Sequence, residues 1–442
     1  RSSDLVMSSS LAILGAGISG LALAFNLKQK GENLSLFEKT SRPGGWIRSM
    51  SEQGYFFECG PRSIRSQDSA GFLELVDKLN LQSALRKAPR AAFSRYLYVG
   101  GHLQKLPGSL LSALSSPLLR PHLWTIAKEP FQSPVLLEDE SVHAFFSRRF
   151  SPSFADTFID PMMSGIFAGD AKTLSIQGCL PKVVEMEERY GSLLKAAFLK
   201  KGSGPTELYT LEGGLERIIT ALADSLKEVL HLDHPIQGLH PKNNKLLLRH
   251  GDREDLFDKV ISTLPAYALA SLLPECALRA ALEELSFSSV ATVMLGYKEK
   301  VHSYEGFGYL VPGKEKQEIL GVVFDSSAFP FQNAYPEQMR MTVMLHSNGK
   351  SNQECIEAAL RAVSAHLGVK REPDFVTCRI AEKAIAQYPI GFKKWVKKCE
   401  QEALEFPGLS FLGTSFYGVS VNHSITQALK YELSKNRLSL QN

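Results

Sequence analysis

The stretch LAILGAGISGLALAFNL, residues 11–27, carries no charge and fits three interpretations: an export signal, a membrane anchor or the start of a nucleotide-binding fold. Residues 11–14 are typical of a short buried strand, and the apolar residues of 21–27 recur at the spacing of a helix. The turn between the two segments carries the motif G-x-G-x-x-G, formed by Gly15, Gly17 and Gly20. This motif after a strand and before a helix favours the nucleotide-binding fold.

Each glycine has a physical role in such a turn. The first permits the tight turn, the second lets a pyrophosphate approach the backbone, and the third lets helix and strand pack closely. Unpaired N–H groups at the helix N-terminus would bind the phosphates, with Ile18 and Ser19 in the first turn. Glycines would also weaken a membrane-spanning helix, so the export and anchor interpretations are set aside.

A second strand is predicted at residues 34–37, after Gly31 ends the helix, and Glu38 stands at its end. A carboxylate there can accept hydrogen bonds from ribose hydroxyls and would repel a 2′-phosphate. The simpler alternative for Glu38 is a solvated strand end. Lys39 follows it directly.

Two further segments, EKTSRPGGWIRS at 38–49 and GYFFECGPRSIR at 54–65, extend the pattern. Arg42 can neutralise phosphate or order the loop, and the glycine pair of RPGG lets backbone close over a cofactor, although RPGG also fits a surface turn. Together these segments resemble the FAD-binding signature of the amine oxidase-like flavoproteins. The resemblance implies FAD as cofactor, with contacts from Gly15, Gly17, Ile18, Ser19, Gly20, Glu38, Lys39, Arg42, Gly44, Gly45, Trp46, Gly60, Pro61, Arg62, Ile236, Gly413, Val419 and Val421.

Later segments return to the same domain. An amphipathic helix is predicted after Gly213–Gly214, a buried strand and turn at 258–266, a strand at 409–412, and a helix from about Ser424. The N-terminus of that last helix would stabilise negative charge on a reduced flavin. His423, just before it, is interpreted as a capping residue.

Nine strings occur in order along the whole chain: GGWIRS, GPRSIRSQ, SRYLYVGGHLQKLP, SGIFAGDAKTLSI, GFGYLVP, LGVVFDSSAFP, MTVML, QYPIGF and FYGVSVN. They resemble the protoporphyrinogen oxidase family of haem and chlorophyll biosynthesis. The resemblance implies oxidation of protoporphyrinogen IX to protoporphyrin IX in three two-electron flavin cycles, with O₂ as the acceptor and H₂O₂ as the second product.

A porphyrinogen is a broad, mostly apolar ring with propionates, so its site needs apolar walls and a cation. The resemblance implies that Arg95 pairs with a propionate, for which a guanidinium is well shaped. It also implies a substrate site lined by Gly169, Phe307, Gly308, Leu310, Val323 and Met344. Without the resemblance, the apolar members would be interpreted as strand core and Arg95 as half of a surface salt bridge. No residue stands out as a catalytic base, and the flavin is the oxidant.

The predicted fold class is α/β, with a discontinuous Rossmann-like FAD-binding domain, a mixed and largely antiparallel substrate domain, and a helical domain. The predicted divisions are 10–94, 206–264 and 396–442 for FAD binding, 95–205 for the helical region and 265–395 for the substrate domain. Three prolines interrupt the apolar part of the helical region, which therefore cannot span a bilayer. Its leucines and Trp124 either lie on a membrane surface or pack against the fold.

Composition narrows the function further. The 442 residues include 50 Lys plus Arg against 46 Asp plus Glu, and a net charge of +4 is too small and dispersed for nucleic-acid binding. The six cysteines form no zinc-type cluster, so no metal is expected and reduced thiols in the cytoplasm are favoured. Peripheral membrane association and a homodimer are both compatible with the sequence.

Three alternatives stay open. A coproporphyrinogen III oxidase would need extra cations for two more propionates, and the family resemblance supplies Arg95 alone. An amine or carotenoid oxidoreductase would share the fold. A non-catalytic nucleotide-binding scaffold is the rival of a different class.

Overall fold

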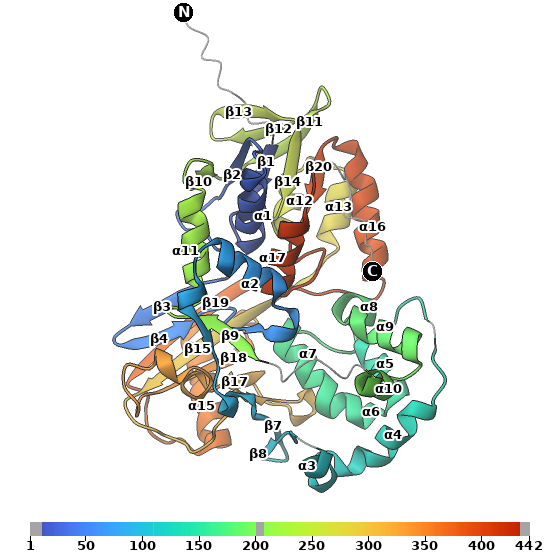
Figure 1. The fold of residues 1–442 in the computed structure, drawn as a ribbon, viewed down its shortest axis with the longest axis vertical. Coiled ribbons are helices and arrows are strands. Elements are labelled where there is room, and N and C mark those ends of the chain that lie inside the picture. The colour runs from blue at the N-terminus through green and yellow to red at the C-terminus, as the bar shows by residue number, and fades with distance from the viewer. Residues whose placement is uncertain (1–10, 109, 136, 200–206, 434–442) are drawn as a thin grey trace, which may run out of the picture.

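A computed structural model describes residues 11–108, 110–135, 137–199 and 207–433. Three parts are visible in Figure 1: a parallel sheet with its helices at the top, a larger sheet at the lower left, and a group of helices at the lower right. The predicted domain limits at residues 10, 205, 206 and 442 lie outside the described residues.

The upper sheet has five strands, and every neighbouring pair is parallel. In spatial order the strands are β10 (Leu230–His231), β2 (Leu34–Phe37), β1 (Leu11–Leu14), β14 (Lys259–Ser262) and β20 (Leu409–Phe411). They come from three distant stretches of the chain, as the sequence predicted. The chain therefore leaves this sheet twice and returns to it.

Both faces of β1 are buried, which explains the uncharged run at the start of the chain. Leu11 and Ile13 pack in one core, against helices on one face of the sheet: α1 (Ile18–Gln29), α2 (Ala70–Lys78), α11 (Glu216–Ser225) and α17 (Val421–Lys430). Ala12 and Leu14 pack in a second core with α12 (Ala266–Ala270), α13 (Ala277–Glu283), α16 (Phe392–Glu402) and the strands β11 (Gly238–Lys242), β12 (Lys245–His250) and β13 (Arg253–Phe257). Alternate residues thus serve opposite faces.

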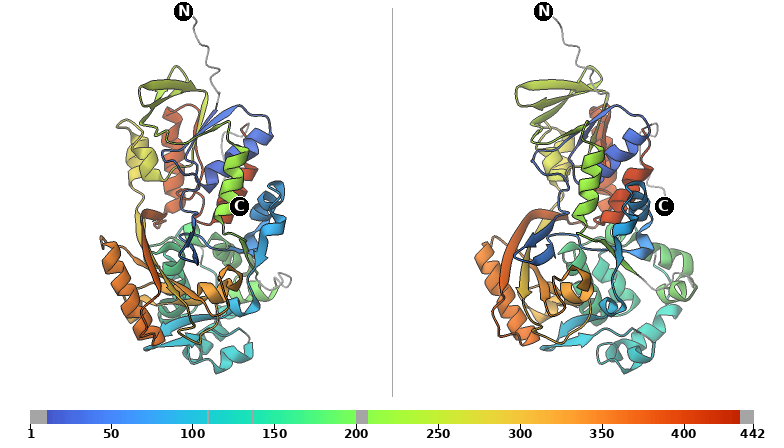
Figure 2. Two further views of the ribbon diagram at one scale, coloured as in Figure 1. Left: turned by 90° about the vertical axis from the view of Figure 1, so that its left-hand side faces the viewer. Right: turned by 60° about the vertical axis from the view of Figure 1, so that its left-hand side comes forward.

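The lower sheet has seven strands, antiparallel except between β16 and β7. Their spatial order is β19 (Phe375–Ala386), β15 (Phe287–Tyr297), β18 (Met339–His346), β17 (Gly321–Val323), β16 (Gly308–Leu310), β7 (Arg95–Val99) and β8 (His102–Lys105). Helix α15 (Asn352–Leu367) packs on one face, beginning at a capping box in which Ser351 and Glu354 bond each other's backbone. The other face looks toward the helices at the lower right (Figure 2).

Those helices are short and follow one another closely: α3 (Leu110–Ser115), α4 (Leu123–Lys128), α5 (Val142–Arg149), α6 (Pro152–Phe154), α7 (Asp160–Phe167), α8 (Ile176–Cys179), α9 (Pro181–Tyr190) and α10 (Leu193–Leu199). A buried ion pair between Arg149 and Glu129 lies among them, and Glu187 bonds both Arg149 and Arg148. No helix in the described part of the chain is both long and apolar enough to cross a bilayer.

Three local predictions are corrected. Residues 95–105, assigned to a helical region, form a hairpin, because Gly100 and Gly101 both take positive φ and make the turn between β7 and β8. Helix α17 begins at Val421 rather than near Ser424. His423 is therefore inside the helix, and Ser420 stands at the cap without a side-chain bond.

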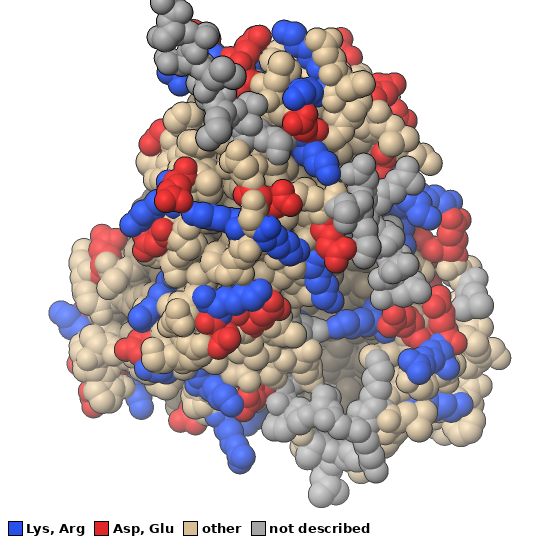
Figure 3. Space-filling model, turned by 45° about the horizontal axis from the view of Figure 1, so that its top comes forward, with Lys and Arg blue, Asp and Glu red and all other residues tan. Residues whose placement is uncertain are grey.

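Smaller elements join the two sheets. The hairpin of β3 (Ser49–Glu52) and β4 (Tyr55–Glu58) packs on β15 of the lower sheet, where Tyr55 and Phe57 bury Met294. A three-stranded sheet of β5 (Ile64–Arg65), β9 (Leu208–Leu211) and β6 (Leu85–Lys87) lies beside it. Acidic and basic side chains are interspersed on the face in Figure 3, which is hollowed near its lower centre.

Candidate functional site

The turn from β1 to α1 has the shape that its three glycines predicted. Gly15 takes a φ of +94° and donates its N–H to the carbonyl of Phe37 at 2.8 Å. A Cβ on Gly20 would lie 1.9 Å from the Gly15 carbonyl oxygen, so only glycine lets the helix pack here. A Cβ on Gly17 would meet no atom within 4 Å, and the space in front of the helix is therefore open.

The N-terminus of α1 is suited to an anion. Gly17 is the cap residue, no side chain bonds the first N–H groups, and the first turn holds no acidic residue. The positive end of the helix thus faces the open space at Gly17. Ile18 and Ser19 begin the helix with their side chains buried, so what the first turn offers to a ligand is backbone. These features fit a pyrophosphate.

Glu38 lies at the end of β2, beside this turn. One carboxylate oxygen accepts the N–H of Ala16 at 3.0 Å, and the other accepts the N–H and hydroxyl of Thr40 at 3.1 and 2.9 Å. The carboxylate is therefore fixed at the edge of the sheet, half-buried, and is more than a solvated strand end. Lys39 is exposed.

The RPGG segment packs on the glycine turn. Gly44 donates its N–H to the carbonyl of Ala16 at 2.7 Å, and a Cβ on Gly45 would lie 3.4 Å from the Cα of Gly17. Arg42 donates to the carbonyls of Gly45 and Ile47 and pairs with Glu216 at 3.0 Å. These contacts order the loop, one of the two roles the sequence left open for Arg42, and its contact with phosphate stays a prediction.

The C-terminal part meets the same turn. Gly413 has a φ of +107°, and a Cβ there would lie 3.5 Å from the Ser19 hydroxyl. Thr263, at the end of β14, donates its hydroxyl to the carbonyls of Leu14 and Gly15 at 2.9 Å each. Thr263 was not predicted from the sequence, although its place after a strand predicted to reach this edge was a usable signal.

Tyr388 fixes the segment between Gly413 and α17. Its hydroxyl donates to the carbonyl of Thr414 and accepts the N–H of Gly418 at 3.0 Å. Burial raises the pKa of this phenol well above its usual value, so the group stays neutral. Val419 is half-buried in this segment and Val421 opens α17. The strings QYPIGF and FYGVSVN are thus linked by one side chain.

The remaining predicted FAD residues fall in two places. Trp46 is 46% exposed, and a Cβ on Gly60 would lie 2.2 Å from its carbonyl oxygen, so Gly60 packs directly on the residue that follows the RPGG loop. Pro61 is half-buried. Ile236 is half-buried beside the second core and precedes β11.

Arg62 is buried and pairs with Asp325 at 2.8 Å, while Thr342 donates its hydroxyl to the other oxygen of Asp325 at 2.7 Å. This network joins the predicted flavin loop to β18, the strand that carries Met344. Asp325 and Thr342 were not identified from the sequence, because Arg62, to which Asp325 is bonded, lies 263 residues away along the chain.

Strand register brings five of the predicted substrate residues onto one face of the lower sheet: Arg95, Gly308, Leu310, Val323 and Met344. Gly308 is paired with both Arg95 and Val323. A second set of cross-strand partners is called the substrate-face row: Leu97, Leu310, Gly321, Met344, Thr292 and Arg379. Cross-strand partners share a face, and α15 packs on the opposite one through Ala291, Val293 and Val343. The substrate-face row is thus free of α15.

Arg95 lies at one end of this face. Its guanidinium stands 5.7 Å from the ring centre of Phe307, and no carboxylate of the described residues forms an ion pair with it. The pKa of Arg95 is lowered mainly by desolvation and to a smaller extent by the charge of Arg65. Two neighbouring cations without an acid between them are suited to an anionic ligand. Arg65 was missed because its short strand gave no signal.

The helical part contacts the lower sheet at two places. A Cβ on Gly165 in α7 would lie 2.8 Å from a methyl group of Leu310. Gly169, just after α7, packs on Gln387, whose amide oxygen would lie 2.1 Å from a Cβ there. Leu310 on β16 therefore lies against α7, whereas Gly169 lies beside the residue that follows β19, the edge strand farther from Arg95.

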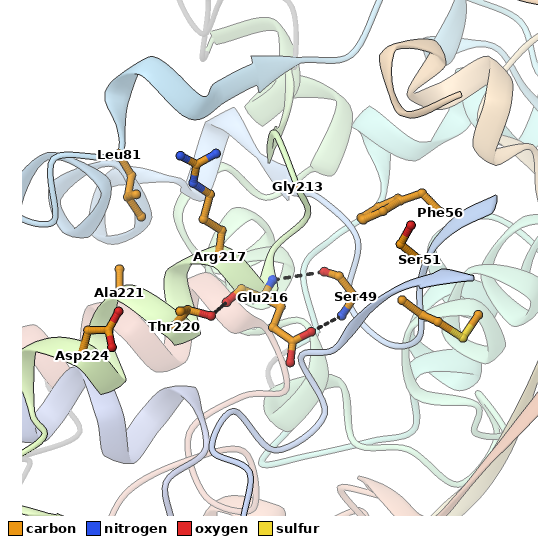
Figure 4. Close-up of a pocket in the computed structure, with 11 residues that line it drawn as sticks. Ser49, Ser51, Phe56, Leu81, Gly213, Glu216, Arg217, Thr220, Ala221 and Asp224 are labelled. Atoms are coloured by element: carbon orange, nitrogen blue, oxygen red, sulfur yellow. Dashed lines mark hydrogen bonds between the residues drawn. The ribbon is translucent and has the colours of Figure 1, made fainter. Parts of the chain in front are cut away.

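A separate hollow of about 530 Å³ lies beside the first turn of α11 (Figure 4). In it the carboxylate of Glu216 accepts the N–H of Ser49 at 2.9 Å, and the Ser49 hydroxyl accepts the N–H of Glu216 at 3.3 Å. The lining residues are Ser49, Met50, Ser51, Phe56, Leu81, Gly213, Glu216, Arg217, Thr220, Ala221 and Asp224. None of the predicted FAD or substrate residues is among them.

Comparisons with known proteins agree with this geometry. Residues 18–421 match the family described as flavin containing amine oxidoreductase. The chain is 34% identical to the protoporphyrinogen oxidase of Homo sapiens, over 95% of this chain and 96% of that protein. It is 24% identical to the coproporphyrinogen III oxidase of Staphylococcus aureus, over 95% and 97%. A solved structure from Exiguobacterium sp. 255-15 has the same fold, with a TM-score of 0.83, 23% identity and coverage of 95% and 96%.

Proposed function

The chain belongs to the flavin containing amine oxidoreductase family, and from this premise we propose that it oxidises protoporphyrinogen IX to protoporphyrin IX in haem biosynthesis. Six electrons and six hydrogens leave the substrate in three two-electron steps, and three molecules of O₂ become three of H₂O₂. Identity of 34% to the human protoporphyrinogen oxidase, over nearly the whole of both chains, supports this substrate.

The observation that carries the proposal is the substrate-face row. It lies beside the row that runs from Arg95 through Gly308 and Val323 to Thr342, whose hydroxyl shares Asp325 with Arg62. It adds the half-buried apolar side chains of Leu310 and Met344 to that face. An apolar face with a cation at one end suits a ring that carries carboxylates at one edge. This arrangement would place the porphyrinogen ring between Arg95, which binds its carboxylate, and the flavin.

FAD, when bound, supplies the two-electron oxidant. The open N-terminus of α1 would hold its pyrophosphate, with Gly17 and Gly45 giving backbone access, and Glu38 would accept from its ribose. Arg95 would bind a propionate and orient the ring, with Phe307 packed against its guanidinium. Leu310, Val323 and Met344 would exclude water from the reacting edge. We assign no protein side chain as a general base.

Purified enzyme should convert protoporphyrinogen IX to fluorescent porphyrin with O₂ uptake and peroxide release in equal amounts. Parallel assays with coproporphyrinogen III test the alternative substrate, which is favoured to some degree by Arg65 beside Arg95. We expect a higher kcat/KM for protoporphyrinogen. Equal or reversed preference would assign the chain to coproporphyrinogen, and no oxidation of either would end the proposal.

We further propose that the helical part rests on a membrane surface. Its exposed large apolar side chains among the described residues are Leu114, Trp124, Phe131, Val135, Leu137, Ile166, Phe198 and Leu199, with Phe131 88% exposed. Of the leucines for which membrane contact and packing against the fold were both left open, Leu118 is buried and Leu119 is half-buried. The side chains of Leu110 and Leu111 are not among those described. Sedimentation with liposomes should retain the wild type and release a W124S/F131S variant. Equal sedimentation of both would contradict this proposal.

A further inference from the structure

Arg379 is a cation on the substrate-face row to which the proposed reaction assigns no role. It lies in β19 opposite Thr292, which is itself opposite Met344. The row places its side chain on the face free of α15, at the opposite end from Arg95. The residue is half-buried.

The guanidinium of Arg379 is poorly satisfied by the protein. Its Nε is buried without a hydrogen-bond partner. Its one side-chain contact with a polar or sulfur atom of the described residues is from an Nη to the Met50 sulfur at 4.0 Å, a weak acceptor. No carboxylate of the described residues pairs with it. A buried N–H donor without an acceptor is costly unless a ligand supplies one.

The surroundings indicate which ligand. Burial raises the pKa of the Cys59 thiol, and Arg379 is the strongest of the charges that oppose this rise. Arg379 is thus close to Cys59, the residue before Gly60, in the loop predicted to contact the flavin. Arg95 lies five strands away, roughly 24 Å along the sheet at ordinary strand spacing. Two propionates on neighbouring rings cannot reach both arginines.

We propose that Arg379 faces the flavin ring and stabilises the negative charge that the ring carries when it is reduced. A preorganised cation beside the ring favours the reduced form and so raises the midpoint potential. The inference rests on the proposed function, because it requires bound FAD. It adds a positively charged partner to the helix N-terminus of α17, which the sequence predicted for the same purpose.

The test compares three FAD-loaded variants by equilibrium reduction against a reference dye, without porphyrinogen. R379M should lower the two-electron midpoint potential by about 30 mV or more, which corresponds to a tenfold change in the equilibrium. R379K keeps the charge and should retain most of the potential. R371M is the control, because Arg371 is exposed and pairs with Glu299 and Asp374 outside the site. It should leave the potential unchanged.

The outcomes separate this inference from the proposed function. A wild type that binds no FAD removes the proposed function. A wild type and R379M that both hold FAD with equal potentials overturn the inference alone. Equal potentials with a raised KM for coproporphyrinogen III would assign Arg379 to a substrate carboxylate and also overturn it. If R379M does not hold FAD, equal potentials in R379Q and R379K overturn it.

Discussion

The two sheets reach their functions in different ways. The parallel sheet forms its site from consecutive residues: a strand, a glycine turn and a helix within 11–29, closed by a carboxylate at 38. The antiparallel sheet forms its site from single residues on strands up to 284 positions apart, such as Arg95 and Arg379. The first site is a property of the backbone, and the second is a property of strand register. This difference decides which substitutions each of the two sites can tolerate.

The largest effect is expected where the two regions are joined. R62M should destabilise the protein by about 3–5 kcal/mol, because it leaves the buried carboxylate of Asp325 without its partner. Urea unfolding of R62M, D325N and the double variant measures this. The double variant should recover part of the loss. Additive losses would mean that the pair does not couple the regions.

The next effect separates two glycines of one turn. G20A should cost about 3 kcal/mol, since its Cβ would lie 1.9 Å from the Gly15 carbonyl oxygen. G17A should leave unfolding of the FAD-free protein nearly unchanged but weaken FAD binding, because its Cβ enters the space proposed for the pyrophosphate. Denaturation and FAD titration of both variants check this. Normal FAD affinity in G17A would contradict the proposed cofactor position.

A smaller effect is expected from Glu58, which lies between the sheets and bonds the N-terminus of α11. Burial raises its pKa from 4.5 to about 7, despite hydrogen bonds from Leu215 N–H and Ser49. The folded protein therefore holds this proton more tightly, and stability falls as pH rises from about 4.5 through about 7, by at most about 3 kcal/mol. E58Q should flatten that part of the stability profile. An identical slope in wild type and E58Q would show that Glu58 is not responsible.

The smallest effect is expected in the substrate region, where a single exposed side chain is changed. R95M should raise the KM for protoporphyrinogen at least about tenfold, through loss of a charge-assisted hydrogen bond. R95K should lose less, and the dimethyl ester of the substrate should be insensitive to both changes. R90M, at an exposed arginine nearby, serves as the control. A fall in kcat with KM unchanged would rule out the anchoring role.

The same contrast explains what sequence could predict. The turn at Gly15, the strands β1 and β2 and the apolar face of α11 were predicted because their signals are local. The hairpin at 95–105 was missed although Gly100 and Gly101 lie at its turn, because the surrounding region is helical. Strand β19 was missed because polar residues interrupt its pattern, and Arg379 was missed with it. Asp325 and Thr342 depend on a contact with Arg62 that local patterns do not encode.

The most direct test of the account is the colour of the protein under anaerobic conditions. Purified enzyme should carry oxidised flavin, lose its absorbance when protoporphyrinogen is added without O₂, and regain it in air. Colourless protein that takes up no FAD, or a flavin spectrum unchanged by protoporphyrinogen, would contradict the account.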